Sequence, residues 1–231
     1  MSIADKLTTI AENEVKVFNA GKEAEYNSFW DMLQENGKRY DYTMGFSGGS
    51  WNDETFKPKY DIKPSWACVS MFNRTHITDL EAALNRSGVI LDLSNNANYG
   101  DCFAYSKITV LPEITLASFA STTYNMFSNC TKLHTIRKLT FSEGMTINFT
   151  DTFPVCTALT NVEFAGILTG SISLKDSPLS KASIESLIGI LSDTATGKTV
   201  TLKSSAVEVA MPWDVWDELI ATKPNWTFSL V

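Results

Sequence analysis

Residues 127–136 read FSNCTKLHTI, and residues 153–162 read FPVCTALTNV. Both stretches follow the pattern F-x-x-C-x-x-L-x-x-[IV], and the second starts 26 residues after the first, at 153 instead of 127. A copy that is one residue shorter, with Ser in place of Cys, starts at Phe103, and a fainter copy starts at Phe72. Such a repeat indicates structural units that are too small to bury an apolar face alone and that stack on one another.

The repeated apolar positions are expected to stack in register. Each Phe would lie on the next Phe, each Cys or Ser on the next, and each Leu on the next, which builds one continuous core. The small Cys or Ser would lie where the chain turns inward and space is tight. The predicted ladder consists of Phe72, Phe103, Phe127, Phe153, Cys130, Cys156, Leu133 and Leu159.

Short stretches between the boxes alternate apolar and polar residues, which is typical of strands that are buried on one face. The predicted strands are residues 89–93, 138–141, 146–149 and 162–164. The last repeat-like turn is residues 171–174, after which the pattern changes.

The F-x-x-C-x-x-L-x-x-I box resembles the BspA-type leucine-rich repeat, also called the Treponema pallidum type, over residues 67–203. The resemblance implies an α/β fold, a leucine-rich-repeat solenoid of short strands, here with a long N-terminal helix and a helical C-terminal cap. The fuller family pattern includes an Ile-Pro step between boxes, which this chain does not keep. The family has no fixed active site, so the resemblance implies no catalytic residues.

A second resemblance covers three shorter stretches. The chain is similar to proteins encoded in gut Firmicutes genomes and their prophages at residues 2–7, residues 49–58 and the pair Trp226-Thr227. This similarity implies an interaction or virion-associated role without catalysis.

Residues 1–38 form the first predicted domain, with one helix over residues 3–36. Apolar residues at three- and four-residue spacing give this helix a continuous stripe, Ser2 suits its N-cap, and Asn36-Gly37 is a stop signal. The stripe favours a parallel coiled coil that makes the protein a homo-oligomer. The alternative is a helix that folds back and caps the solenoid.

Residues 39–66 are predicted to be an aromatic-rich connecting or capping segment, because aromatic residues crowd among Gly and Pro. Aromatic residues at this density need a cover, which favours a small core over the first repeat. In the alternative, exposed rings stack on sugars or anchor a protein partner. The candidate partner-binding residues are Trp51, Tyr60 and Trp66.

The C-terminal cap is predicted at residues 204–231. Terminal units must shield the open end of a stacked core, and Trp213, Trp216 and Trp226 supply apolar area for that purpose. The elements expected near this end are helices at 183–191 and 212–221 and strands at 199–202 and 226–230.

The bulk properties exclude several classes of partner. A formal net charge of −7 without a basic run argues against a general binder of nucleic-acid backbones. No apolar stretch approaches the roughly 20 residues of a membrane span. Residues 1–7 lack the basic and apolar regions of a signal peptide, so synthesis in the cytoplasm is expected. The final location stays open, with a virion or a cell surface suggested by the resemblance.

No arrangement of residues predicts catalysis, a metal or a cofactor. The gaps between the four cysteines do not match zinc or redox spacing, and there is no Walker loop, dinucleotide fingerprint or G-x-S-x-G elbow. His134 lies at a variable position of the box, which predicts an exposed side chain. Asp214 and Asp217 are interpreted as a solvated helix face and not as a glycosidase pair. Asp53-Glu54 beside Trp51 either binds a sugar or forms a turn.

The expected function is a non-catalytic binding module whose repeat surface contacts a protein or a glycan, as in a phage tail-associated or adhesin-like protein. An alternative is a structural or assembly protein, with the solenoid as a rigid spacer and the N-terminal helix as the oligomerisation element. A third hypothesis is a carbohydrate-active enzyme that uses the aromatic segment.

Overall fold

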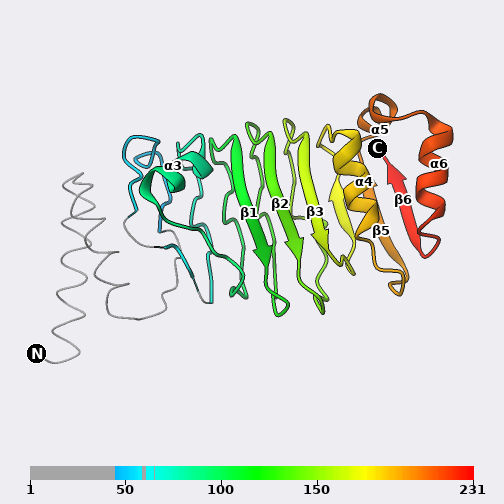
Figure 1. Ribbon diagram of the computed structural model, residues 1–231, viewed down its shortest axis with the longest axis horizontal. Helices are drawn as coiled ribbons and strands as arrows, with labels where there is room; N and C mark the ends of the chain where they lie inside the picture. Colours follow the sequence, from blue (N-terminus) through cyan, green and yellow to red (C-terminus); the bar gives the residue numbers. More distant parts are fainter. Residues whose placement is uncertain (1–44, 59–60, 65) are drawn as a thin grey trace, which may run out of the picture.

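The structure is a computed structural model, and it describes residues 45–58, 61–64 and 66–231. Figure 1 shows successive passes of the chain lying side by side along the long axis of the molecule, with helices at the C-terminal end. The predicted helix over residues 3–36, and with it the expected coiled coil, lies outside the described residues.

Three parallel strands form the first sheet, in the order β1 (Val110–Leu116), β2 (Thr135–Phe141) and β3 (Asn161–Gly166). Their register aligns apolar residues of neighbouring strands, for example Leu111 with Ile136. Inward-facing side chains are buried and outward-facing ones are polar, so one face of the sheet builds the core and the other meets solvent.

The second sheet is also parallel and contains β4 (Ile172–Leu174), β5 (Lys198–Leu202) and β6 (Trp226–Leu230). The chain between β5 and β6 forms α5 (Ser204–Ala210) and α6 (Trp213–Ala221), which lie at the C-terminal end in Figure 1. The expected last helix and last strand are confirmed.

Two further helices, α3 (Leu80–Ser87) and α4 (Lys181–Gly189), flank the first sheet in Figure 1. The carboxylate of Asp79 accepts a hydrogen bond from the N–H of Ala82 and caps the start of α3. Gly88 ends this helix with a φ of 66°. Both caps are readable in the sequence, although no helix was predicted at α3.

A row of stacked phenylalanine rings runs through the interior, one ring from each pass of the chain. The ring centroids are 5.4 Å apart between Phe72 and Phe103, 5.4 Å between Phe103 and Phe127, and 4.9 Å between Phe127 and Phe153. The interplanar angles of 2°, 5° and 14° make the rings nearly parallel. All four side chains are buried, as are the leucines of the predicted ladder. We call these four rings the phenylalanine spine.

Hydrogen bonds explain the small residue three positions after a spine phenylalanine. The thiol of Cys130 donates to the carbonyl of Phe103, and the thiol of Cys156 donates to the carbonyl of Phe127, both at 3.0 Å. The hydroxyl of Thr75 donates to a carbonyl of the preceding pass in the same way. Burial raises the pKa of the Cys130 thiol to about 12, so the thiol stays protonated and can act as a donor.

The predicted fold class, a leucine-rich-repeat solenoid over residues 67–203, is wrong. The described chain instead contains two separate three-stranded parallel sheets and four helices, and it shows no solenoid of repeats. The predicted strands at 89–93 and 146–149 contribute only isolated bridges, at Leu91 and Phe149.

Helix α4 supplies the physical reason why the first sheet ends. The hydroxyl of Ser183 accepts the N–H of Val162 at 2.8 Å, and the hydroxyl of Ser186 accepts the N–H of Phe164 at 3.3 Å. Side chains thus bind the backbone donors at the free edge of β3, which blocks pairing with a further strand. An apolar repeat shows which residues point inward, but it does not show where strand pairing stops.

Phe127→Ala is expected to lower the free energy of unfolding by about 3–5 kcal/mol, because it removes one ring of the spine and leaves a cavity. Urea unfolding followed by circular dichroism measures this change. Tyr124→Ala is the control, since Tyr124 is 59% exposed on the same pass, and it should change stability by less than about 0.5 kcal/mol. Equal effects of the two substitutions would contradict a stabilising spine.

Candidate interaction surface

The three aromatic candidates do not form one exposed cluster. Trp51 is only 7% exposed, and its ring packs edge-on against Phe46 with the centroids 5.4 Å apart. Trp66 is 68% exposed, and Tyr60 lies outside the residues that the structure describes. Trp51 therefore belongs to the core and has little surface to offer a sugar or a protein, whereas Trp66 is available at the surface.

The titratable groups that the sequence singled out form structural contacts or face solvent. Asp53 accepts hydrogen bonds from the N–H groups of Thr78 and Asp79, at 2.9 and 3.4 Å, and from the Thr78 hydroxyl. Burial by itself would raise the pKa of Asp53, but these bonds outweigh burial and hold the pKa below its usual value. Asp214 and Asp217 are exposed on α6. Within the described residues, no cluster of three or more His, Cys, Asp or Glu side chains could hold a metal ion.

Four non-glycine residues with positive φ form a row beside the phenylalanine spine. They are Arg74 (57°), Tyr105 (59°), Asn129 (55°) and Val155 (62°), and each follows a spine phenylalanine by two residues. We call these four residues the turn ridge. Since the spine rings of neighbouring passes stack directly, the ridge residues of neighbouring passes also lie side by side.

Hydrogen bonds between passes accompany the positive φ values. The N–H of Tyr105 donates to the carbonyl of Ser128 in the next pass at 2.8 Å. The N–H of Val155 donates to the carboxylate of Asp176 at 2.9 Å. The N–H groups of Arg74 and Asn129 also donate to carbonyl groups of the next pass, each at 2.9 Å. These bonds tie each left-handed position of the ridge to the segment that lies next to it along the stack.

Tyr105 and Val155 are costly residue types for this conformation. The left-handed region costs an L-residue roughly 1–2 kcal/mol, is adopted most readily by Gly and Asn, and is an outlier for bulky or β-branched residues. Burial does not offset the cost, because Tyr105 is 49% exposed and Val155 is 40% exposed. Elsewhere the chain does use glycine where a side chain would clash, as at Gly166, where a Cβ would lie 2.0 Å from a backbone oxygen of Phe141. The strain at the ridge therefore points to a task for the exposed side chains.

A cation–π contact joins two of the exposed side chains of the ridge. The guanidinium of Arg74 lies 5.3 Å from the centroid of the Tyr105 ring, a cation–π contact that orients the ring. A companion row lies four residues before each ridge residue, and it supplies hydroxyl, carboxylate and amide groups. The companion row consists of Ser70, Asp101, Asn125 and Asp151.

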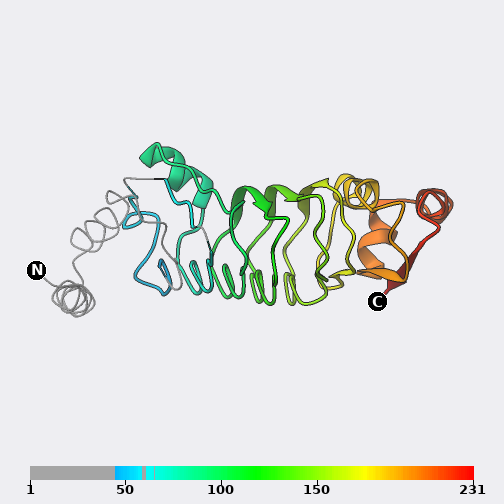
Figure 2. The same ribbon diagram turned by 90° about the horizontal axis from the view of Figure 1, so that it is seen from below.

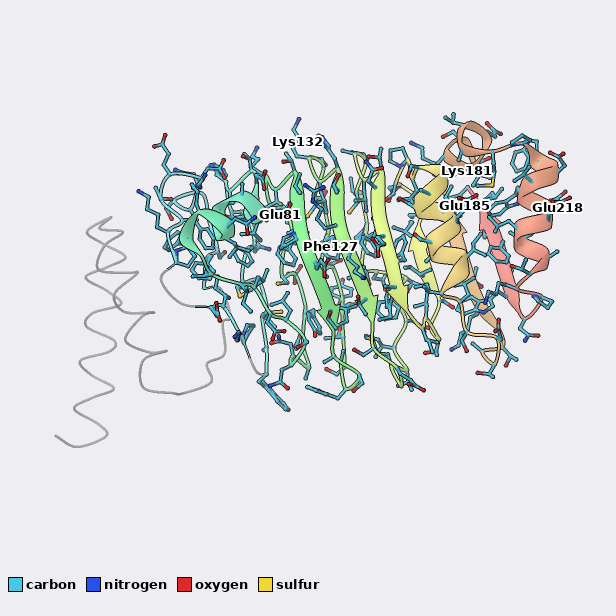
Figure 3. The ribbon with its side chains drawn as sticks, in the orientation of Figure 1. Glu81, Phe127, Lys132, Lys181, Glu185 and Glu218 are labelled. Carbon is cyan, nitrogen blue, oxygen red and sulfur yellow. The ribbon has the colours of Figure 1, made fainter. Side chains whose placement is uncertain are left out.

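The solvent face of the first sheet, between α3 and α4, is a second candidate surface. Figure 3 shows Glu81 and Glu185 on the two flanking helices, and a groove of ≈ 320 Å³ lies between the sheet and α4. The charges on this face pair with one another, Arg137 with Glu81 at 2.8 Å and Lys138 with Glu163 at 3.4 Å. Such partly exposed pairs contribute little to stability, and this face carries no backbone strain that calls for a function.

No family model matches this chain, and no curated protein or solved structure is significantly similar to it. The resemblance to BspA-type repeats therefore stays a prediction. In the part of the chain that the structure describes, no helix combines the length and the apolar character needed to cross a membrane.

Sequence reasoning missed the turn ridge. A signal was available, because each ridge residue follows a spine phenylalanine by two residues and Asn129 suits a positive φ. Tyr105 and Val155 belong to residue types that rarely adopt this conformation, so their local sequence does not predict a positive φ.

Val155→Asn is expected to raise the free energy of unfolding by about 1 kcal/mol, because Asn tolerates the left-handed conformation and the lost side chain is exposed. Thermal and urea unfolding measure the change. Val209→Asn is the matched control, since Val209 is 89% exposed on α5 and has no positive φ. This control substitution should leave the free energy of unfolding nearly unchanged. A Val155→Asn protein less stable than the control would show that the fold needs this valine.

Proposed function

We propose that the protein is a non-catalytic binding module that holds a protein or glycan ligand along its turn ridge. The exposed side chains of Tyr105 and Val155, kept at left-handed positions, are the observation that carries this proposal. Strain of this kind persists where a side chain has a task beyond folding. The phenylalanine spine supports the ridge from below, so a ligand would meet side chains on a rigid base.

The use of the ionisable groups also supports binding over catalysis. Asp61 forms an ion pair with Lys63 at 2.8 Å, and the hydrogen bond from Lys63 lowers the pKa of Asp61. Asp53 is engaged at the start of α3, where it accepts backbone N–H groups. The third hypothesis, a carbohydrate-active enzyme, relied on the aromatic segment, in which Trp51 is part of the core.

The alternative proposal is a structural or assembly protein that oligomerises through residues 3–36, which lie outside the described part of the chain. The two proposals are compatible, because an oligomer would display several ridges and raise a weak affinity through avidity. Such multivalent display would suit a phage tail-associated or adhesin-like protein.

A photo-crosslinking amino acid at residue 129, in the middle of the ridge, is expected to form adducts with components of the cell envelope or extract of the native source. Diazirine chemistry captures proteins and glycans alike, so the experiment does not presuppose the class of ligand. The same amino acid at residue 209 is the control, because Val209 is 89% exposed and belongs to α5.

Excess unlabelled wild-type protein should abolish the adducts formed at residue 129. A competitor that carries Arg74→Ala, Tyr105→Ala and Val155→Asn together should not abolish them. Equal labelling at residues 129 and 209, or equal competition by both proteins, would contradict a binding role for the ridge.

A further inference from the structure

We propose that the ligand of the turn ridge is a neutral linear glycan that lies along the stack, with one sugar ring to each pass of the chain. This inference rests on the proposed function and names the chemical class of its ligand. Three features of the ridge favour this class: its spacing, its mixture of side chains and its charge.

The spacing of the ridge follows from the spine beneath it. Spine rings are separated by 5.4, 5.4 and 4.9 Å, which is close to the length of one pyranose ring in an extended polysaccharide. Side chains on one face of an extended peptide repeat at about 6.6–6.8 Å, so within a few passes they would no longer lie opposite successive ridge residues. Figure 2 shows the turns of the chain following one another along the long axis, as a linear ligand would require.

An α-helical partner has a pitch of about 5.4 Å, but helices dock through an apolar stripe laid into a groove. The ridge is a row of single residues and offers only two exposed apolar side chains, Tyr105 and Val155. A stable protein interface needs about 800 Å² from each partner with an aromatic or apolar centre. A single row of side chains does not provide such a centre.

The side chains of the two rows match the two surfaces of a sugar ring. Tyr105 and Val155 can pack against the C–H groups, and the contact with Arg74 holds the tyrosine ring in a fixed orientation before a ligand arrives. Hydroxyl groups of a sugar both donate and accept hydrogen bonds. The Asn129 amide and the companion residues, which precede each spine phenylalanine by two positions, carry such acceptors and donors.

Charge selects among glycans. The ridge and companion rows contain one cation, Arg74, and two carboxylates, Asp101 and Asp151. Arg74 already lies over the Tyr105 ring. An acidic polysaccharide would meet more carboxylates than cations along this surface and would be repelled, whereas a neutral polysaccharide would not.

Affinity electrophoresis tests this inference with a panel of neutral polysaccharides (hydroxyethylcellulose, laminarin and mannan) and with polygalacturonate as the acidic probe. A neutral-glycan array extends the panel. We expect at least one neutral glycan to retard the full-length protein and polygalacturonate to leave its mobility unchanged. Titration with oligosaccharides of that glycan should show affinity rising with length up to about four sugar units, one for each ridge residue.

Variants link binding to the ridge. Tyr105→Ala should weaken binding by about tenfold, and Tyr105→Phe should retain it, because the ring and not the hydroxyl makes the contact. Val155→Asn should weaken binding while the protein becomes more stable, which separates loss of the contact from loss of the fold. Phe119→Ala, a control at an aromatic residue outside the ridge that is 53% exposed, should bind as the wild type does.

Three results would overturn the glycan inference: retardation by no neutral glycan, retardation by polygalacturonate alone, or binding that Tyr105→Ala leaves unchanged. If ridge-dependent crosslinked adducts still form and proteases but not glycosidases remove them, the proposed function stands and the glycan inference fails. If neither a glycan nor a ridge-dependent adduct is found, both fail.

Discussion

Stacking of one phenylalanine ring on the next sets the geometry of this molecule. Backbone hydrogen bonds join the passes of the chain, and the rings stack 4.9 to 5.4 Å apart at the spacing that this pairing allows. Left-handed residues lie two positions after each ring, and also two positions before three of the rings, and the N–H groups of those after each ring bind the following pass or Asp176. Core packing, backbone strain and the exposed turn ridge are consequences of one constraint.

The repeated box predicted which side chains point inward, because apolar spacing reports directly on burial. It did not predict hydrogen-bond partners at the strand edges. Residues 89–93 and 146–149 alternate as strands do and yet form only bridges at Leu91 and Phe149. The hydroxyls of Ser183 and Ser186 accept hydrogen bonds from backbone N–H groups at the edge of β3. The presence of a serine in a helical segment does not predict this role. The predicted fold class was wrong because the sequence does not show where pairing between strands stops.

The candidate site was less predictable than the core, for a related reason. The sequence favoured a small aromatic core around Trp51 and kept a partner-binding role as the alternative, and contacts with Phe46 place Trp51 in the interior. Tyr105 and Val155 looked ordinary, because their left-handed backbone arises from stacking and not from local preference.

Native-state hydrogen exchange at the backbone amides of Tyr105, Asn129 and Val155 tests the central claim most directly. If stacking holds these residues in the left-handed conformation, their N–H groups are bound to the next pass or to Asp176 although the side chains of Tyr105 and Val155 are exposed. The amides should then exchange as slowly as those of the spine phenylalanines. Exchange at the rate of a solvent-exposed loop would contradict the account.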